Sequence, residues 1–355
     1  MTAPFTLPPG SEATAPPEAR GLARDGVTLL AARPGAVTTH RFRELPDLLA
    51  PGDVVVVNTS PTEPARLDAV RGDGTVTPVH VATTLDDGSW VVEVRRPDNT
   101  GPDLGAEPGS VLLLPGGVRL RLVAPFPVPG SRLWRAGTDP AVTAAAHLAR
   151  YGTPIRYGHL AGAVPLAALQ NVYATPADPT GMASTGMAST EMASAEMASA
   201  GRPFTDRLLV RLVARGVAVL PLQLHAGVSS PELHEPPAPE RFAVPAATAR
   251  IVTGTRAAGG RVVAVGTTVT RALESATGED GVTRPASGWT DLVLGPDRPA
   301  RVVGGLVTGL HAPEASHLQL LAAVAGVDLV DRAYRTAVAA HLLWHEFGDS
   351  MLFLP

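Results

Sequence analysis

The sequence contains no cysteine and no lysine. Without cysteine there can be no disulfide bond, no thiolate nucleophile and no sulfur-based zinc site. With a formal net charge of -4, the chain has no overall basic field, so any contact with a nucleic acid would need a local patch of arginines. No apolar run reaches about 18 residues, and the N-terminus lacks a basic start followed by an apolar core. We therefore expect a soluble, cytoplasmic protein that does not enter a membrane.

Two segments are expected to lack a fixed structure. Residues 1–20 are rich in proline and read as a disordered N-terminal segment. Residues 181–197 carry repeated five-residue units of one methionine and small side chains, which suit a flexible loop. Methionines at this spacing spiral around a helix and have no histidine or cysteine beside them, so no metal site is expected. Only the last repeat should be structurally fixed.

The remaining chain predicts an α/β fold. The stretch "DVVVVN" at 53–58 is typical of a buried strand. Residues 62–150 alternate in short apolar runs between Gly, Pro and Asp turns, which favours a small β-barrel or sandwich. The second half alternates strands with helices, one of which begins after Thr205 as N-cap. We expect a major mixed α/β layered domain, residues 21–61 and 151–355, with a small β-barrel domain inserted at 62–150.

Polar side chains follow several of the expected buried strands. They are Asn58, His225, Thr267, Thr268 and His311. Ligands of open α/β sheets bind at this edge, because the loops diverge there and helix N-termini point inward. The "VGTT" stretch suits an anionic or hydroxyl-rich ligand. No Walker loop or zinc-protease motif is present, so these residues alone predict a ligand site of unknown chemistry.

Six stretches in order resemble one family, the S-adenosylmethionine:tRNA ribosyltransferase-isomerases of the queuosine pathway. The stretches are "FRELPDLLAPGDVVVVNTSPTEPARL" at 42–67, "LQNVYA" at 169–174, "LQLHAG" at 222–227, "AVGTTVTRALE" at 264–274, "LVTGLHAPEASHLQLLAAVAG" at 306–326 and "FGDSMLFLP" at 347–355. The resemblance implies that S-adenosylmethionine is a co-substrate. Its ribosyl part would be transferred and isomerised onto 7-aminomethyl-7-deazaguanine in a tRNA anticodon stem-loop, giving epoxyqueuosine and releasing adenine and methionine. We expect no further cofactor, no metal ion and a monomeric chain.

The resemblance also implies roles for individual residues. His225 or His311 would transfer a proton. Arg66 and Arg271 could hold a carboxylate or a phosphate. Glu346 and Asp349 could meet ribose hydroxyls or the amine, or be helix-end carboxylates without a ligand role. The full set of expected substrate-binding residues is Asn58, Arg66, Gly201, Phe204, Gly227, Gly266, Thr267, Thr268, Arg271, Glu346 and Asp349.

The chain departs from the family pattern in three loops. Residues 59–61 lack an acid and an arginine, 235–240 keep only Glu240, and Arg202-Pro203 replace a Leu-His pair. Arg202 could contact a tRNA phosphate, close the pocket over a smaller acceptor, or be an exposed loop charge. Two rival functions therefore stay open: cleavage or rearrangement of S-adenosylmethionine for a small-molecule acceptor, and tRNA binding without catalysis.

Overall fold

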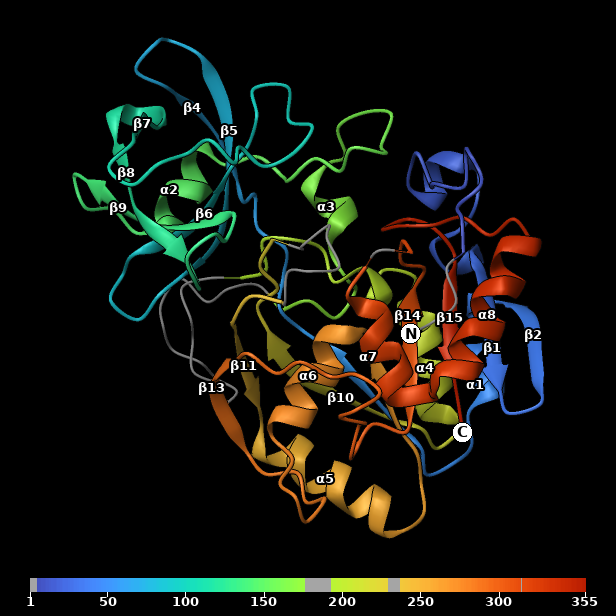
Figure 1. Ribbon diagram of the computed structural model, residues 1–355. Coiled ribbons are helices and arrows are strands. Elements are labelled where there is room, and N and C mark those ends of the chain that lie inside the picture. Colours follow the sequence, from blue (N-terminus) through green and yellow to red (C-terminus); the bar gives the residue numbers. More distant parts are fainter. Residues whose placement is uncertain (1–4, 176–192, 229–236, 314) are drawn as a thin grey trace.

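The computed structural model describes residues 5–175, 193–228, 237–313 and 315–355 (Figure 1). The larger of its two sheets has nine strands. These are β1 (Thr28–Arg33), β2 (Ala36–Arg41), β3 (Val54–Asn58), β10 (Ala218–Leu224), β11 (Glu240–Val244), β12 (Val262–Val265), β13 (Ala286–Thr290), β14 (Gly305–Gly309) and β15 (Ser350–Phe353). They lie in the order β13-β11-β10-β3-β12-β14-β15-β1-β2. The four strands β10, β3, β12 and β14 are mutually parallel, and antiparallel pairs flank them. The expected mixed α/β architecture is confirmed.

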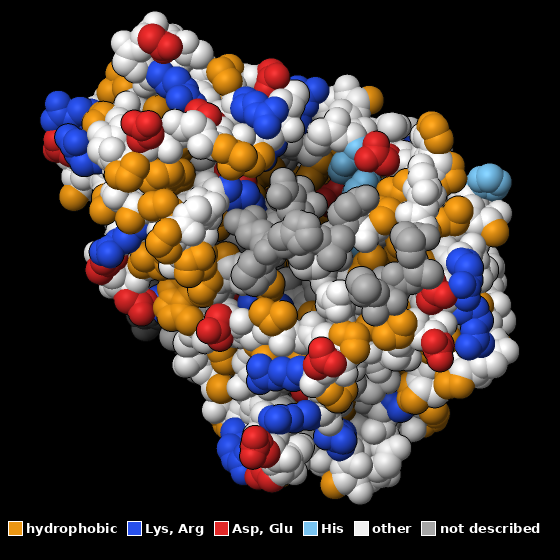
Figure 2. All heavy atoms as spheres, in the orientation of Figure 1, with side chains coloured by type: hydrophobic (Ala, Val, Ile, Leu, Met, Phe, Trp, Pro, Cys, Tyr) orange, Lys and Arg blue, Asp and Glu red, His pale blue; other side chains and the backbone are white. Residues whose placement is uncertain are grey.

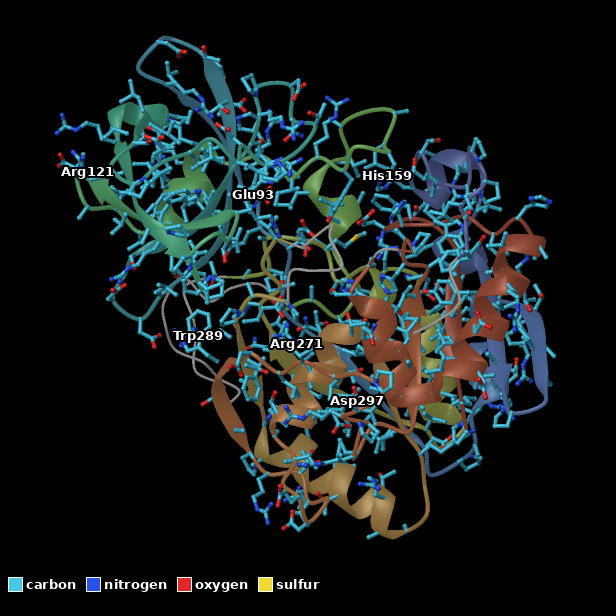
Figure 3. All side chains as sticks on the ribbon, in the orientation of Figure 1. Glu93, Arg121, His159, Arg271, Trp289 and Asp297 are labelled. Atoms are coloured by element: carbon cyan, nitrogen blue, oxygen red, sulfur yellow. The ribbon has the colours of Figure 1, made fainter. Side chains whose placement is uncertain are left out.

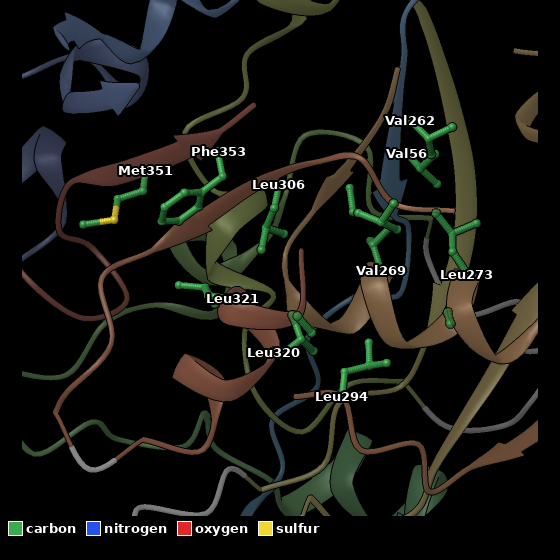
Figure 4. Packing of buried hydrophobic residues seen from close by; sticks show 14 of the residues in the cluster. Val56, Val262, Val269, Leu273, Leu294, Leu306, Leu320, Leu321, Met351 and Phe353 are labelled. Atoms are coloured by element: carbon green, nitrogen blue, oxygen red, sulfur yellow. The ribbon is translucent and has the colours of Figure 1, made fainter. Parts of the chain in front are cut away.

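Strand β3 shows why this sheet has two covered faces. Val54 and Val56 pack in one hydrophobic cluster, and Val55 and Val57 pack in another. Because successive side chains of a strand point to opposite faces, an unbroken valine run requires layers on both sides. One face is covered by α5 (Ala246–Ala257), α6 (Thr267–Ser275), α7 (His317–Ala325) and α8 (Val327–Ala339), and the other by α1 (Leu45–Leu48) and α4 (Asp206–Ala214). Figure 4 shows Val269 and Leu273 of α6 packed near Val56 in the first cluster.

The second sheet closes on itself in the order β4-β5-β6-β9-β8-β7. Its strands are β4 (Arg66–Val70), β5 (Val76–Thr84), β6 (Trp90–Val94), β7 (Val111–Leu113), β8 (Arg119–Phe126) and β9 (Leu133–Asp139). Trp90 and Leu120 are buried in its centre, where Leu148 of α2 (Ala144–Tyr151) joins them. Figure 1 shows these strands to one side of the nine-stranded sheet.

The N-terminal segment is ordered over residues 5–20, so the expectation of disorder is wrong there. Phe5 packs with ring centroids 5.0 Å from Tyr334 and 5.4 Å from Trp344. The backbone of Glu12 forms a β-bridge with Trp344. A short helix, η1 (Pro17–Arg20), ends the segment. Its few apolar side chains find a preformed surface at the C-terminal part of the chain, which composition alone does not reveal.

The repeat segment is also more ordered at its end than expected. Residues 181–192 lie outside the described part of the chain, but 193–197 are packed. Ala193, Ala195 and Met197 are buried, and Ser194 Oγ lies 2.8 Å from Ser60 Oγ. The expectation of flexibility is therefore wrong for 193–195, whose small side chains pack against the loop after β3, whereas the last repeat, 196–200, is ordered as expected.

Two helix predictions have different outcomes. Helix α4 begins where expected, with Thr205 Oγ1 accepting a hydrogen bond of 3.2 Å from the Leu208 backbone N–H. The stretch "DLVDRAYRTAVAAHLLWHEFG" predicts one longer helix over 328–348, but α8 ends at Ala339. His341 and His345 then adopt positive φ angles of 52° and 69° and fold the chain into turns. No helix among the described residues is long and apolar enough to cross a membrane.

Candidate active site

A cavity of about 450 Å³ lies at the carboxyl ends of β12 and β14. This volume is within the range of sites that enclose small molecules. Its walls come from the start of α6, the start of α7, the loop at 196–200, and barrel residues that include Phe126 and Arg132. The cavity thus lies where the two sheets approach each other. In Figure 3, Arg271 of α6 and Glu93 of the barrel lie on opposite sides of this region.

The floor of the cavity is the turn from β12 into α6. Gly266 has φ 94° and precedes Thr267 and Thr268, the first residues of the helix. A side chain other than hydrogen would be strained at this φ, and its Cβ would lie 3.4 Å from Ala200 Cβ. Backbone N–H groups at the start of α6 and two threonine hydroxyls therefore converge on the cavity, an arrangement that suits an anionic or hydroxyl-bearing ligand.

Two histidines stack in parallel at the next strand end. The rings of His311 and His317 have centroids 4.5 Å apart and an interplanar angle of 4°. His311 Nε2 lies 2.9 Å from Thr308 Oγ1. Burial lowers the pKa of His311 well below its usual value, assisted by His317 and His345, and burial lowers the pKa of His317 to about 4. Both imidazoles are therefore neutral near pH 7, the form that can accept a proton.

Arg271 lines the cavity but is already engaged within the protein. Its guanidinium is paired with Glu240, and it donates hydrogen bonds of 3.0 Å to Leu292 O and 3.2 Å to Thr290 O. Burial raises the pKa of the Glu240 carboxyl, with Arg271 and the Gly227 N–H acting in the opposite direction. The pair joins β11 and the loop after β13 to α6.

A family model described as "Queuosine biosynthesis protein" matches residues 2–353. The chain belongs to this family. A relative from Symbiobacterium thermophilum is 34% identical over 99% of this chain and 98% of its own length. One from Moorella thermoacetica is 35% identical over 99% and 98%. Both relatives are named S-adenosylmethionine:tRNA ribosyltransferase-isomerase.

A solved structure has a related fold. It is the S-adenosylmethionine tRNA ribosyltransferase of Thermotoga maritima, 26% identical, which matches 99% of each chain with a TM-score of 0.52. The family resemblance inferred from the six stretches is therefore confirmed over the whole chain.

The cavity brings together about half of the residues expected to form the family's site. Those that line it are Gly227, Gly266, Thr267, Thr268, Arg271, His311 and Glu346. They come from strand ends and helix starts that are far apart in the sequence. The expected convergence at the carboxyl edge of the sheet thus holds for β12 and β14.

Asn58 and His225 follow neighbouring strands but do not line this cavity. Asn58 Nδ2 donates to Leu224 O at 2.8 Å and its Oδ1 accepts from Leu224 N at 3.0 Å, which ties β3 to β10. His225 Nδ1 lies 2.8 Å from Ser60 Oγ, and burial lowers the pKa of this histidine to about 4. Its ring borders a separate, more open hollow beside the barrel, together with Arg241.

The other four expected residues lie in supporting positions outside the cavity. Phe204 is fully buried, with its ring centroid 5.2 Å from that of Phe42. A Cβ on Gly201 would meet the Tyr173 hydroxyl at 1.9 Å, so only glycine fits there. Arg66 pairs with Asp68 at 2.7 Å on the barrel.

The Asp349 carboxylate accepts hydrogen bonds from two backbone N–H groups. One of its carboxylate oxygens accepts from Thr28 N at 2.6 Å and the other from Leu343 N at 2.8 Å. These bonds connect the start of β1 to the turn before β15. Of the alternatives left open by the sequence, the contacts match a structural carboxylate.

Several cavity residues were missed by looking only at strand ends. His317, Glu196 and His345 line the cavity from a helix start, the final repeat and a turn. His317 stands in the same family-like stretch as His311, six residues later, which was the signal available. Glu196 belongs to the last repeat, and its neighbours 197–200 also line the cavity. His345 carried no sequence signal.

Proposed function

We propose that this chain is an S-adenosylmethionine:tRNA ribosyltransferase-isomerase. The observation that carries the proposal is the match of nearly the whole chain to that family, together with a cavity at the strand ends where the family-like stretches meet. The enzyme would transfer the ribosyl part of S-adenosylmethionine to 7-aminomethyl-7-deazaguanine in tRNA.

S-adenosylmethionine would occupy the cavity with its polar groups at the start of α6. The N–H groups and hydroxyls of Thr267 and Thr268 suit its carboxylate or its ribose hydroxyls. The hydrophobic part of the wall, which includes Leu292 and Leu320, suits the methionine side chain or the adenine ring.

Proton transfer is assigned to His311 in preference to His225. The sulfonium acidifies the adjacent C5' hydrogens, so a neutral imidazole in the cavity can remove one of them to start the rearrangement. His311 lines the cavity, whereas His225 is bonded to Ser60 outside it. The parallel ring of His317 and the hydroxyl of Thr308 would fix the orientation of His311.

The six-stranded barrel at about 62–150 would be an inserted domain that closes one side of the cavity. Arg132, which lines the cavity, is paired with the fully buried Glu93. The acceptor would reach the cavity from between the two sheets. We place the anticodon stem-loop there.

Adenine release tests the proposal against both rivals. The protein is incubated with S-adenosylmethionine, with and without tRNA that carries the aminomethyl-deazaguanine, and free adenine is measured. Adenine released only with that tRNA supports the proposal. Release at the same rate without tRNA would instead identify a small-molecule enzyme, and tRNA binding with no adenine under any condition would identify a non-catalytic binder.

A further inference from the structure

Two histidines and a glutamate from distant segments meet at the rim of the cavity. His159 lies in the loop before α3 (Leu166–Leu169), and His345 and Glu346 lie in the turn between α8 and β15. One ligand atom from each of the three lies within 4.8 Å of the others. The two imidazole rings are stacked with centroids 4.8 Å apart. Figure 3 shows His159 beside the C-terminal turns, and Figure 2 shows histidine next to an acidic side chain on this face.

Two atoms of this cluster are buried and face each other as an ion pair, without a well-aligned hydrogen bond to any described residue. They are His159 Nε2 and Glu346 Oε2, which lie 3.0 Å apart. The side chain of His159 is only 9% exposed, so water does not readily satisfy its nitrogen. Buried polar atoms normally form well-aligned hydrogen bonds, and an ion bound between these two atoms would satisfy both of them.

The backbone supports the same arrangement. His345 has φ 69°, an uncommon conformation for a residue other than glycine. This turn places consecutive side chains, those of His345 and Glu346, beside His159. Glu12 Oε1 lies 3.1 Å from His345 Nε2 and can orient that ring, as carboxylates do for histidines that bind metal ions.

We propose that His159, His345 and Glu346 bind one divalent transition-metal ion of the Zn²⁺ or Co²⁺ type. Two imidazoles and one carboxylate suit such an ion, whereas Mg²⁺ and Ca²⁺ prefer oxygen ligands alone. Ligand bonds of about 2.0–2.2 Å place tetrahedral donor atoms roughly 3.3 Å apart, so small rotations of these partly exposed side chains close the site. The carboxylates of Glu346 and Glu12 together carry two negative charges, which balance the charge of a divalent ion.

The site would have a free coordination position on the cavity side. Three protein ligands leave the fourth tetrahedral position to water or to a bound molecule. His345 and Glu346 also line the cavity. An anionic or amine group of a molecule in the cavity could therefore complete the coordination. Metal binding itself does not depend on the proposed reaction and is measured without S-adenosylmethionine or tRNA.

The test is metal titration of the full chain after treatment with a chelator. Zn²⁺ affinity is measured by competition with a coloured chelator, and Co²⁺ by its visible absorption, which is strong for a four-coordinate ion. We expect one ion per chain. His159→Phe, which keeps a stacking ring, and Glu346→Gln, which keeps the shape, should each weaken binding at least about tenfold.

A matched control separates the site from ordinary His–Glu pairs. His40 and Glu44 form a surface pair at 3.6 Å, and His40→Ala should leave metal affinity unchanged. Circular dichroism confirms folding of each variant. If His159→Phe is unfolded, His345→Asn serves in its place, since asparagine tolerates positive φ. The proposal is overturned if the wild-type protein binds no ion, or if the folded variants bind Zn²⁺ and Co²⁺ as tightly as the wild type does.

Discussion

Arg202 lies buried beneath Glu18, with its Nη2 3.0 Å from the carboxylate, although 184 positions separate the two residues. The arginine side chain is 3% exposed, whereas that of Glu18 is 45% exposed. Arg202 also donates to Ala168 O at 2.7 Å and lies over the Phe347 ring. None of the three roles considered for Arg202 fits this position: it joins the N-terminal segment to the core instead of contacting phosphate, closing the cavity or standing in solvent.

Replacing Arg202 should therefore change stability and leave the salt dependence of tRNA binding unaltered. Arg202→Ala leaves Glu18 open to water but removes packing against Phe347, so we expect a loss of about 1–2 kcal/mol in urea unfolding. Each lost phosphate contact would make the log-log salt slope shallower by roughly 0.7–0.9. Arg215→Ala, which removes an exposed pair with Asp47, is the control and should cost less than about 0.5 kcal/mol. A shallower slope for Arg202→Ala would contradict the buried position.

The two candidate histidines should differ in activity. His311→Gln should reduce adenine release by about 10²–10⁴, because it removes the proton acceptor in the cavity. His225→Gln should reduce release less than about tenfold and lower stability by roughly 1–2 kcal/mol, because it disturbs a buried hydrogen bond to Ser60. Single-turnover adenine release and urea unfolding measure the two effects. A larger loss of adenine release in His225→Gln than in His311→Gln would assign the proton transfer to His225.

Glu63 should make the protein less stable as the pH rises. Burial raises the pKa of its carboxyl from 4.5 to about 7, although Oε1 accepts a bond of 2.6 Å from the Ala193 N–H. The folded state holds this proton more tightly than the unfolded state, so its stabilising effect is complete below pH 4.5 and is lost as the pH passes 7.

Glu63→Gln should remove that loss. The variant should match the wild type near pH 4.5 and exceed it by about 3 kcal/mol above pH 7, as measured by urea unfolding across the pH range. The control is Glu279→Gln, because the Glu279 side chain is 96% exposed. If the free energies of unfolding of Glu63→Gln and the wild type change with pH in parallel, ionisation of Glu63 does not destabilise the folded state.

Gly266 should be required for ligand binding beyond its effect on stability. Gly266→Ala forces a side chain into φ 94° at the cavity floor, and Gly88→Ala does the same at φ 80° in an exposed turn with open space around it. Both should lose about 1–2 kcal/mol of stability. Only Gly266→Ala should weaken S-adenosylmethionine binding in calorimetry, by at least about tenfold. Equal binding by both variants would place the ligand elsewhere.

The sequence by itself determined the features that depend on neighbouring residues. The valine run of β3 requires two covered faces, Thr205 caps α4, and Gly266 before two threonines turns a strand into a helix. These follow from side-chain alternation, capping and φ preference, which act over a few residues. The ordered stretches also identified the family.

The tertiary structure decided which of these residues meet. His225 and His311 both follow parallel strands, yet only His311 lines the cavity, because Ser60 holds the other ring outside. Three other features depend on partners more than a hundred positions away. They are the ordered structure of residues 5–20, the burial of Arg202 and the cluster at His159. Whether a charge is buried or a proline-rich segment is ordered is set by the surface it meets, and that surface exists only once the chain has folded.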